Sequence, residues 1–454
     1  MKLLHLSRRQ VIKGMTAGSF IASFDSAVSA VPRIPIRILW TGVTFMRSCP
    51  IESASCKELD DYFPHTWATL SSSVGNSEKI HLLDKVVFRS VAPITGKYNN
   101  IRMIFPGPEN SFGASIETNL GMFVGISSDR DIAHHYVKSE NQLVQIAELQ
   151  TYVIVFDIKN YSIIQSYPLR FVGIDSTQKK NRREFVKKMQ WETLVGTGSN
   201  EKSLSRALAK TLKKLVVNQQ KPVGVRVTRI QLKGVAKKWL EQEPTASKHT
   251  ESDYREILGN ALTSAISEKL QIGIQPFSPA DSIMRVTDSM VNKSSELLDK
   301  DFNNGNIDWD IRLTAFGTQI QNKRIAGRKY LFNRRIDIFV GISVGKYKRS
   351  YADEQRLIEI KEDQILEKEV FKNKFHAVSI EETTGTWSNN WFYALDLHTR
   401  LFEWLFENLR KENYALIFNG EQKNLKTRRF LTKAHSHNFS QFKEQAKALR
   451  NILI

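Results

Sequence analysis

A repeated segment places the strongest constraint on how this chain folds. Residues 196–200 read Gly-Thr-Gly-Ser-Asn and residues 385–389 read Gly-Thr-Trp-Ser-Asn. Each copy follows a strand-like stretch, 188–194 or 375–381, and each opens a run of apolar residues at helical spacing. The apolar positions are Leu204, Leu208, Leu212 and Leu215 after the first copy and Tyr393, Leu397, Leu401 and Trp404 after the second. A period of roughly 185–190 residues is far longer than a solenoid repeat, so we predict two homologous domains.

Alternating apolar residues upstream of each copy predict strands that pack on one face. Residues 152–158 and 336–344 show this period of two and are rich in β-branched and aromatic side chains. In the second half the expected order is a strand at 223–230, a helix at 254–270 with one apolar stripe, a short strand at 272–277, long strands at 309–320 and 330–344, and a closing helix at 391–409. The predicted class is therefore α+β, with two homologous mixed α/β domains in tandem, each built from strand, helix, strand, long antiparallel strands and closing helix.

The expected domain boundaries follow from the repeat and from the ends of the chain. We expect a leader at 1–30, a first α/β repeat domain at 31–218 and a second at 219–410. Residues 411–454 have no counterpart in the first half and are predicted to form a C-terminal strand and helix extension. This extension either caps an exposed sheet edge or forms a docking arm.

The amino-terminal residues have the pattern of an export signal. Arg8 and Arg9 lie in the segment Ser-Arg-Arg-Gln-Val-Ile-Lys at 7–13, and a modest apolar run follows, with Val28 and Ala30 before the expected cleavage site. This pattern resembles the twin-arginine signal of bacteria, which implies export of an already folded chain to a periplasmic or secreted location. The alternative is an ordinary basic start of a cytoplasmic protein. No later stretch reaches roughly 18 consecutive apolar residues, so the sequence predicts no transmembrane segment.

Cys49 and Cys56 are the only cysteines of the chain. In an oxidising compartment we expect them to form a disulfide that closes a short loop. They could instead contribute to a metal site, but two ligands are too few for zinc. The disulfide prediction depends on export, because the cytoplasm keeps thiols reduced.

The charge balance favours anionic partners. The chain has 66 Lys and Arg residues against 47 Asp and Glu residues, and its formal net charge is +19. We expect an acidic envelope protein or an anionic envelope polymer as the partner, with peripheral membrane contact as a further option. The alternative is that charge spread over the surface only keeps the protein in solution. Nucleic acid is not the favoured partner.

Two groups of residues are candidates for a binding surface. Six basic residues cluster in the first half: Lys179, Lys180, Arg182, Arg183, Lys187 and Lys188. They form either a polyanion-binding face or a solvated helix face. Trp387 and Trp391 flank the second repeated loop. If exposed, these tryptophans suit a binding surface, and if buried, they belong to the core.

The sequence contains no pattern that predicts catalysis. The close histidine groups, 134–135 and 435–437, lack the i, i+4 spacing and the accompanying carboxylates of a metal-binding helix. Glycine-rich phosphate loops and nucleophile elbows are missing. The two Gly-Thr-X-Ser-Asn loops either seat an anion or cap a helix, and capping is the favoured interpretation. We therefore predict no metal and no cofactor, and we favour a protein that is not an enzyme.

A family resemblance supports this view. The sequence Ile-Leu-Gly-Asn-Ala-Leu at 257–262 and the apolar segment 272–277 fall in the predicted order of elements. In that order and in those motifs each unit, about 180 residues long, resembles the TolB amino-terminal domain, the penicillin-binding-protein activator lipoprotein and the curli-secretion lipoprotein. The resemblance implies binding of envelope proteins and assembly of complexes. The chain lacks a lipobox cysteine, so the lipid anchor of those lipoproteins is not implied.

These observations predict an exported, non-enzymatic binding or assembly protein of the bacterial envelope. It is expected to engage an acidic protein or an envelope polymer through a basic face. Two alternatives stay open. One is a periplasmic enzyme with an active site between the two domains, and the other is a cytoplasmic nucleic-acid-binding protein.

Overall fold

The computed structural model describes residues 36–50, 63, 101–104, 119–137, 142–159, 162–178, 224–242, 250–277, 282–288, 298–302, 307–326, 329–347, 369–384, 390–425 and 428–453. All of them belong to one unit of the chain, Ile36–Ile454. The predicted leader at 1–30 lies outside the described residues. The α+β class is confirmed, because these residues form two mixed sheets and a set of helices.

The first sheet has the strand order β5-β4-β3-β1-β7-β8, and β2 pairs with β1. Its strands are β1 (Ile36–Pro50), β2 (Ile101–Ile104), β3 (Leu120–Val137), β4 (Gln142–Asp157), β5 (Ser162–Gln178), β7 (Ser282–Asp288) and β8 (Leu298–Phe302). Strand β1 is parallel to β3, and β3, β4 and β5 form an antiparallel meander. Strands β7 and β8 come later in the sequence and extend this sheet beyond β1.

The second sheet has the strand order β12-β13-β11-β10-β9-β6. Its strands are β6 (Val225–Leu232), β9 (Ile307–Ala326), β10 (Lys329–Tyr347), β11 (Glu369–Thr384), β12 (Glu421–Leu425) and β13 (Arg428–His435). Strand β6 is parallel to β9, and β9, β10 and β11 form an antiparallel meander. Both sheets thus contain one opening strand parallel to the first strand of a three-stranded meander.

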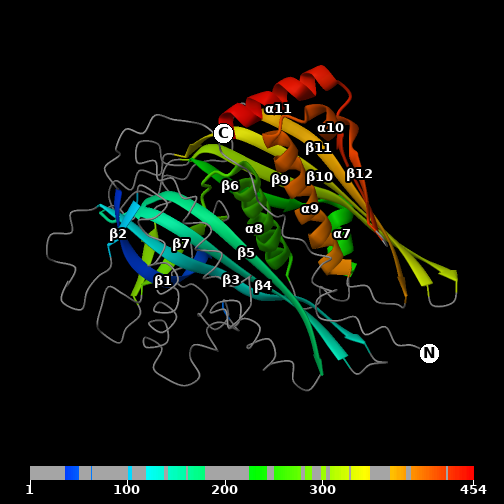
Figure 1. Ribbon diagram of the computed structural model, residues 1–454, viewed down its shortest axis with the longest axis horizontal. Coiled ribbons are helices and arrows are strands. Elements are labelled where there is room, and N and C mark those ends of the chain that lie inside the picture. The colour runs from blue at the N-terminus through cyan, green and yellow to red at the C-terminus, as the bar shows by residue number, and fades with distance from the viewer. Residues whose placement is uncertain are drawn as a thin grey trace. The chain divides into compact units, whose positions relative to one another are not determined.

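Two long helices lie between the sheets (Figure 1). The helices of the described residues are α7 (Gly234–Gln242), α8 (Glu251–Leu270), α9 (Asn390–Arg410), α10 (Tyr414–Asn419) and α11 (Phe439–Leu453). Helix α8 contacts α9, β5 and β6, and α9 contacts β3, β10 and β11. The predicted helices at 254–270 and 391–409 and the predicted strands at 309–320 and 330–344 are confirmed as α8, α9, β9 and β10.

Helix α8 has defined ends and a fully buried middle. Thr250 Oγ1 accepts a hydrogen bond from the Asp253 N–H at 3.1 Å, and Asp253 Oδ2 accepts one from the Thr250 N–H at 2.8 Å, which is a capping box. The helix ends at Gln271, whose φ of 62° is left-handed. Residues 257–267 are all buried, so the expectation of a single apolar stripe was wrong. The physical reason is that sheets cover the helix on more than one side.

The segment after α8 is not the strand that we expected at 272–277. The Ile274 N–H donates to the Ser166 carbonyl of β5 at 3.0 Å, and the Gln275 N–H donates to the Val225 carbonyl of β6 at 2.9 Å. The Ser166 hydroxyl also donates to the Ile274 carbonyl. Successive amides therefore bond to different sheets, whereas a strand needs a ladder to one neighbour. The segment joins an edge of each sheet.

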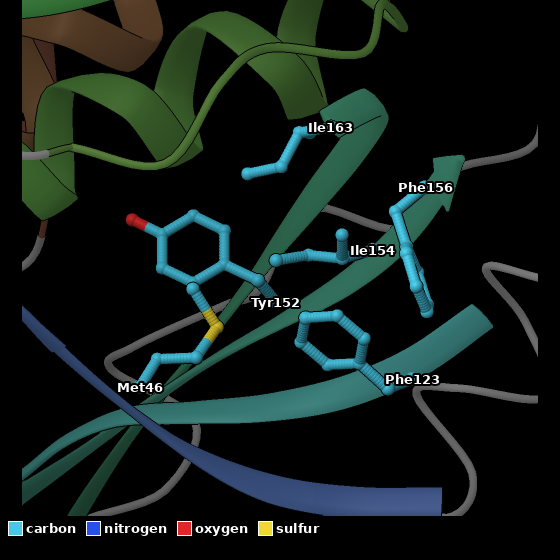
Figure 2. Close-up of a cluster of buried hydrophobic side chains, with 6 residues drawn as sticks. All are labelled: Met46, Phe123, Tyr152, Ile154, Phe156 and Ile163. Atoms are coloured by element: carbon cyan, nitrogen blue, oxygen red, sulfur yellow. The ribbon is translucent and has the colours of Figure 1, made fainter. Parts of the chain in front are cut away.

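The hydroxyl of Tyr152 on β4 links the helical motif at 257–262 to the segment 272–277. The Tyr152 hydroxyl donates to Asn260 Oδ1 at 2.9 Å and accepts from the Phe277 N–H at 3.4 Å. Figure 2 shows the Tyr152 ring beside Met46, with its hydroxyl directed away from Phe123. Burial raises the pKa of Tyr152, so the hydroxyl stays neutral. A Cβ on Gly259 would lie 2.6 Å from ring carbons of Phe277, so only glycine allows this close packing.

The C-terminal extension contains helix α10, strands β12 and β13 and helix α11. Strand β13 pairs with β11, and β12 pairs with β13. Helix α11 packs on β11, where Asn373 Nδ2 donates to Gln445 Oε1 at 2.9 Å. The extension therefore adds to the edge of the second sheet, which agrees with the edge-capping alternative.

Candidate functional site

The binding residues that the sequence suggested lie mostly outside the described part of the chain. Outside it are Arg8, Arg9, Cys56, Lys179, Lys180, Arg182, Arg183, Lys187, Lys188 and Trp387. Cys49 pairs in register with Ile283 of β7, and Trp391 is in the first turn of α9, but only their backbones are described. The site must therefore be sought among other residues.

The second sheet presents its polar side chains on the face away from the helices. Alternate residues of β11, such as Phe371, Phe375 and Ala377, are buried on the helix side, which α9 and α11 cover. The residues between them point to the opposite face, because successive side chains of a strand alternate. Strand β13 does the same, with Phe430 and Ala434 buried.

A cluster of basic side chains lies on this outer face. It consists of Lys372, Lys374 and His376 of β11 and Lys433 and His435 of β13, and we call it the basic face. All of these side chains except His376 are exposed, and His376 is half-buried. Lys374 lies opposite His435, and His376 lies opposite Lys433, in the antiparallel register. Two strands therefore bring cationic or protonatable groups into direct cross-strand pairs.

The register places Asp337 of β10 opposite His376, next to these pairs. Within the described residues, Lys374 and Lys433 have no carboxylate within ion-pair distance. The nearby Asp337 of β10 is held by Arg335, whose Nη2 lies 2.9 Å from Asp337 Oδ1. The face therefore presents the positive charges of Lys372, Lys374 and Lys433 to solvent.

Two phenylalanines support the lysines of this face. Lys372 Nζ lies 5.3 Å from the centre of the Phe339 ring, and Lys374 Nζ lies 5.5 Å from that of Phe316. Such cation–π contacts hold the ammonium groups near the sheet while they keep contact with solvent. The two ammonium groups also lie over the faces of these rings.

His376 makes the charge of the face depend on pH. The His376 and His435 rings are 4.8 Å apart between centroids. Burial lowers the pKa of His376, and His435, Arg335 and Lys433 lower it further, while Asp337 opposes them. His376 is therefore neutral at pH 7, and the face gains positive charge on acidification.

A second polar group lies in the interior, between the first sheet and the helices. Arg130 of β3 lies opposite Glu148 of β4, and Arg170 of β5 lies opposite Gln150, two residues along β4 from Glu148. Arg130 binds Asp253 at 2.9 Å and Glu256 at 2.5 Å, both on α8. Arg170 donates to Glu148, and its Nη1 donates to Thr399 Oγ1 of α9 at 3.2 Å. These charges are paired with one another, so the group fastens the helices to the sheet and does not form a ligand site.

Comparisons with known proteins give no further guide. No model of a known protein family matches the chain, and no curated protein sequence matches it. In the described ranges, no set of three or more His, Cys, Asp or Glu side chains is placed to hold a metal ion. None of the described helices is long and apolar enough to span a membrane.

Sequence reasoning missed the basic face because it searched for runs of basic residues. The signal is Lys-Asn-Lys-Phe-His at 372–376 and Lys-Ala-His at 433–435, in which basic residues occupy every second position. In a strand this spacing places them on one face. The pairing of two segments about 60 residues apart was not visible in the sequence, because register is a property of the folded sheet.

Proposed function

We propose that this chain is an exported, non-enzymatic binding or assembly protein of the bacterial envelope, which holds an anionic partner on its basic face. The observation that supports the binding role most directly is the pairing of Lys374 with His435 and of His376 with Lys433 across β11 and β13. Both lysines are exposed on one face. A bound anion could interact with the two ammonium groups at once, which suits an anion-binding surface.

The charge of the face can be tested directly by substitution. In the variant Lys374→Gln with Lys433→Gln, affinity for fluorescent poly-L-glutamate should fall roughly tenfold or more, because each lysine near a polyanion contributes about 1 kcal/mol. Fluorescence anisotropy at low salt measures the affinity. The attraction in the wild type should also weaken steeply as salt is added.

A matched control removes the same charge elsewhere. Lys411 and Lys447 pair with Glu407 and Glu444 on exposed helix surfaces, and the variant Lys411→Gln with Lys447→Gln should bind poly-L-glutamate nearly as well as the wild type. The basic-face variant should also have nearly the same stability to urea as the wild type, because both lysines are exposed and such substitutions usually change stability by less than about 0.5 kcal/mol. Equal losses of affinity in the two variants would show that only net charge matters, and the proposed site would be wrong.

The export part of the proposal depends on Arg8 and Arg9. Replacing both by lysine should keep the chain in the cytoplasm, because the twin-arginine pathway reads the arginine pair. Cell fractionation with mass measurement of the mature protein checks this, and the wild type should begin at Val31. Thiol labelling before and after reduction should then reveal the Cys49–Cys56 disulfide only in the exported form. If the variant Arg8→Lys with Arg9→Lys is found in the same cellular compartment as the wild type, the export proposal is contradicted.

We also propose that the two halves of the chain are homologous domains. The arrangement of β1 with β3, β4 and β5 has the same directions as that of β6 with β9, β10 and β11. The two Gly-Thr-X-Ser-Asn segments fall at the spacing that the repeat requires. These correspondences support two homologous halves, with β7 and β8 of the second half added to the sheet of the first.

A further inference from the structure

The strands of the basic face continue into an apolar patch. Beyond His376, β11 presents Val378 and Ile380 on the same outer face, and beyond Lys433, β13 presents Leu431. Val378 lies directly opposite Leu431 in the register. Leu431 is 39% exposed, and the other two side chains are half-buried. We call these three residues the apolar strip.

The apolar strip has arginines at its borders. Arg335 of β10 lies opposite Val378, and Arg429 of β13 lies opposite Ile380. Both arginines are exposed. Along β11 and β13 the surface therefore changes from basic to apolar, and Arg429 of β13 and the exposed Glu382 of β11 follow the apolar strip.

This surface distinguishes between anionic partners. A phosphate polymer would interact with the lysines and arginines alone and would leave the apolar strip in water. A single-stranded nucleic acid would need exposed rings for base stacking, whereas Phe316 and Phe339 are half-buried under lysine ammonium groups. A protein segment with both acidic and apolar side chains can use both parts, because burial of apolar area adds to the ionic attraction.

We propose that the partner on this surface is a protein segment carrying acidic and apolar side chains, with its carboxylates on the basic face and an apolar side chain on Leu431 and Val378. This inference rests on the proposed binding function and names the chemistry of its partner. The apolar strip supplies selection among anionic partners, and the basic face supplies attraction that salt weakens.

Three fluorescent probes of similar charge test the proposal on the full-length mature protein. They are poly-L-glutamate, a random glutamate–tyrosine copolymer and inorganic polyphosphate. At about 0.15 M salt, where long-range attraction is screened, the copolymer should bind roughly tenfold more tightly than either of the other two. The variant Leu431→Ser should lose this preference and keep its affinity for poly-L-glutamate.

Val235 gives a matched control, because it is an exposed apolar side chain, 58% accessible, on α7. Val235→Ser should keep the full preference for the copolymer. If polyphosphate binds the wild type as tightly as the copolymer does, the proposal is overturned. The result would then indicate that the partner is an envelope polymer. A preference that survives Leu431→Ser would also overturn it. If none of the three probes binds, the proposed function itself fails.

Discussion

Replacing Glu148 by leucine should lower the free energy of unfolding by about 3–5 kcal/mol. Glu148 is 0% exposed, lies opposite Arg130 in the register of β3 and β4, and accepts a hydrogen bond from Arg170 of β5. Arg170, whose side chain is 14% exposed, would lose its carboxylate partner in a region shielded from water. A buried charge without its counter-ion carries a desolvation cost that the remaining contacts do not recover. Urea unfolding followed by circular dichroism measures the effect.

Two further variants separate the ionic effect from a change in packing. Glu148→Leu combined with Arg170→Leu should recover much of the loss, because both charges then leave the interior together. Glu444→Leu removes one partner of an exposed pair on α11, where the Glu444 side chain is 73% exposed, and should change stability by less than about 1 kcal/mol. If Glu148→Leu is no more harmful than Glu444→Leu, the interior charges do not fasten the helices as described.

The second large effect concerns His398, which should make the fold sensitive to acid. Its side chain is 0% exposed in α9, with Nδ1 2.7 Å from the Ala394 carbonyl oxygen. Within the described part of the chain, Nε2 has no hydrogen-bond partner. Burial lowers the pKa of His398 to about 4, against 6.5 for an ordinary histidine, and the Ala394 hydrogen bond opposes this only in part.

The direction of the pH effect follows from this lowered pKa. Above about pH 6.5 the ring is neutral in both the folded and unfolded states, so its contribution to stability is fully present. As the pH falls toward 4, the unfolded chain takes up the proton first, and the free energy of unfolding decreases. Between pH 7.5 and pH 4.5 this histidine should account for a loss of about 2–3 kcal/mol.

The variant His398→Leu isolates this contribution. Urea unfolding at pH 7.5 and 4.5 should show a loss on acidification that is about 2–3 kcal/mol smaller than in the wild type. His437→Leu is the control, because His437 is exposed, and it should leave the acid-induced loss unchanged. Equal losses in wild type and His398→Leu would show that His398 is not held neutral by burial.

The elements that the sequence predicted correctly are those with strong local signals. Alternating apolar residues at 309–320 and 330–344 correspond to β9 and β10, and the helical spacing at 391–409 corresponds to α9. These patterns depend on residues close together in the chain, so they are readable without knowledge of the fold. The segment 272–277 was misassigned because an apolar run of that length suits any buried backbone, and only the fold decides its partners.

The environment of α8 shows what a single sequence leaves open. Asn260 and Ser264 are polar residues of α8, and both are buried. Asn260 accepts from Tyr152, and Gln150 Nε2 lies 3.5 Å from Ser264 Oγ. Each polar group finds its partner on β4, more than 100 residues away in the chain. Tertiary pairing of this kind leaves no local signal.

The basic face was unpredictable for a related reason. The net charge of +19 indicated anionic partners in general, but it could not say which lysines share a surface. Lys374 and His435 become neighbours only through the register of β11 and β13. The predicted cluster at 179–188 lies outside the described residues and stays a prediction.

The layer formed by α8 and α9 has a consequence for how the protein unfolds. Both sheets bury their apolar sides against the same two helices, so detaching either sheet would expose the core of the other. We expect a single concerted melting event for residues 36–454, and fragments cut between β5 and β6 should aggregate instead of folding alone.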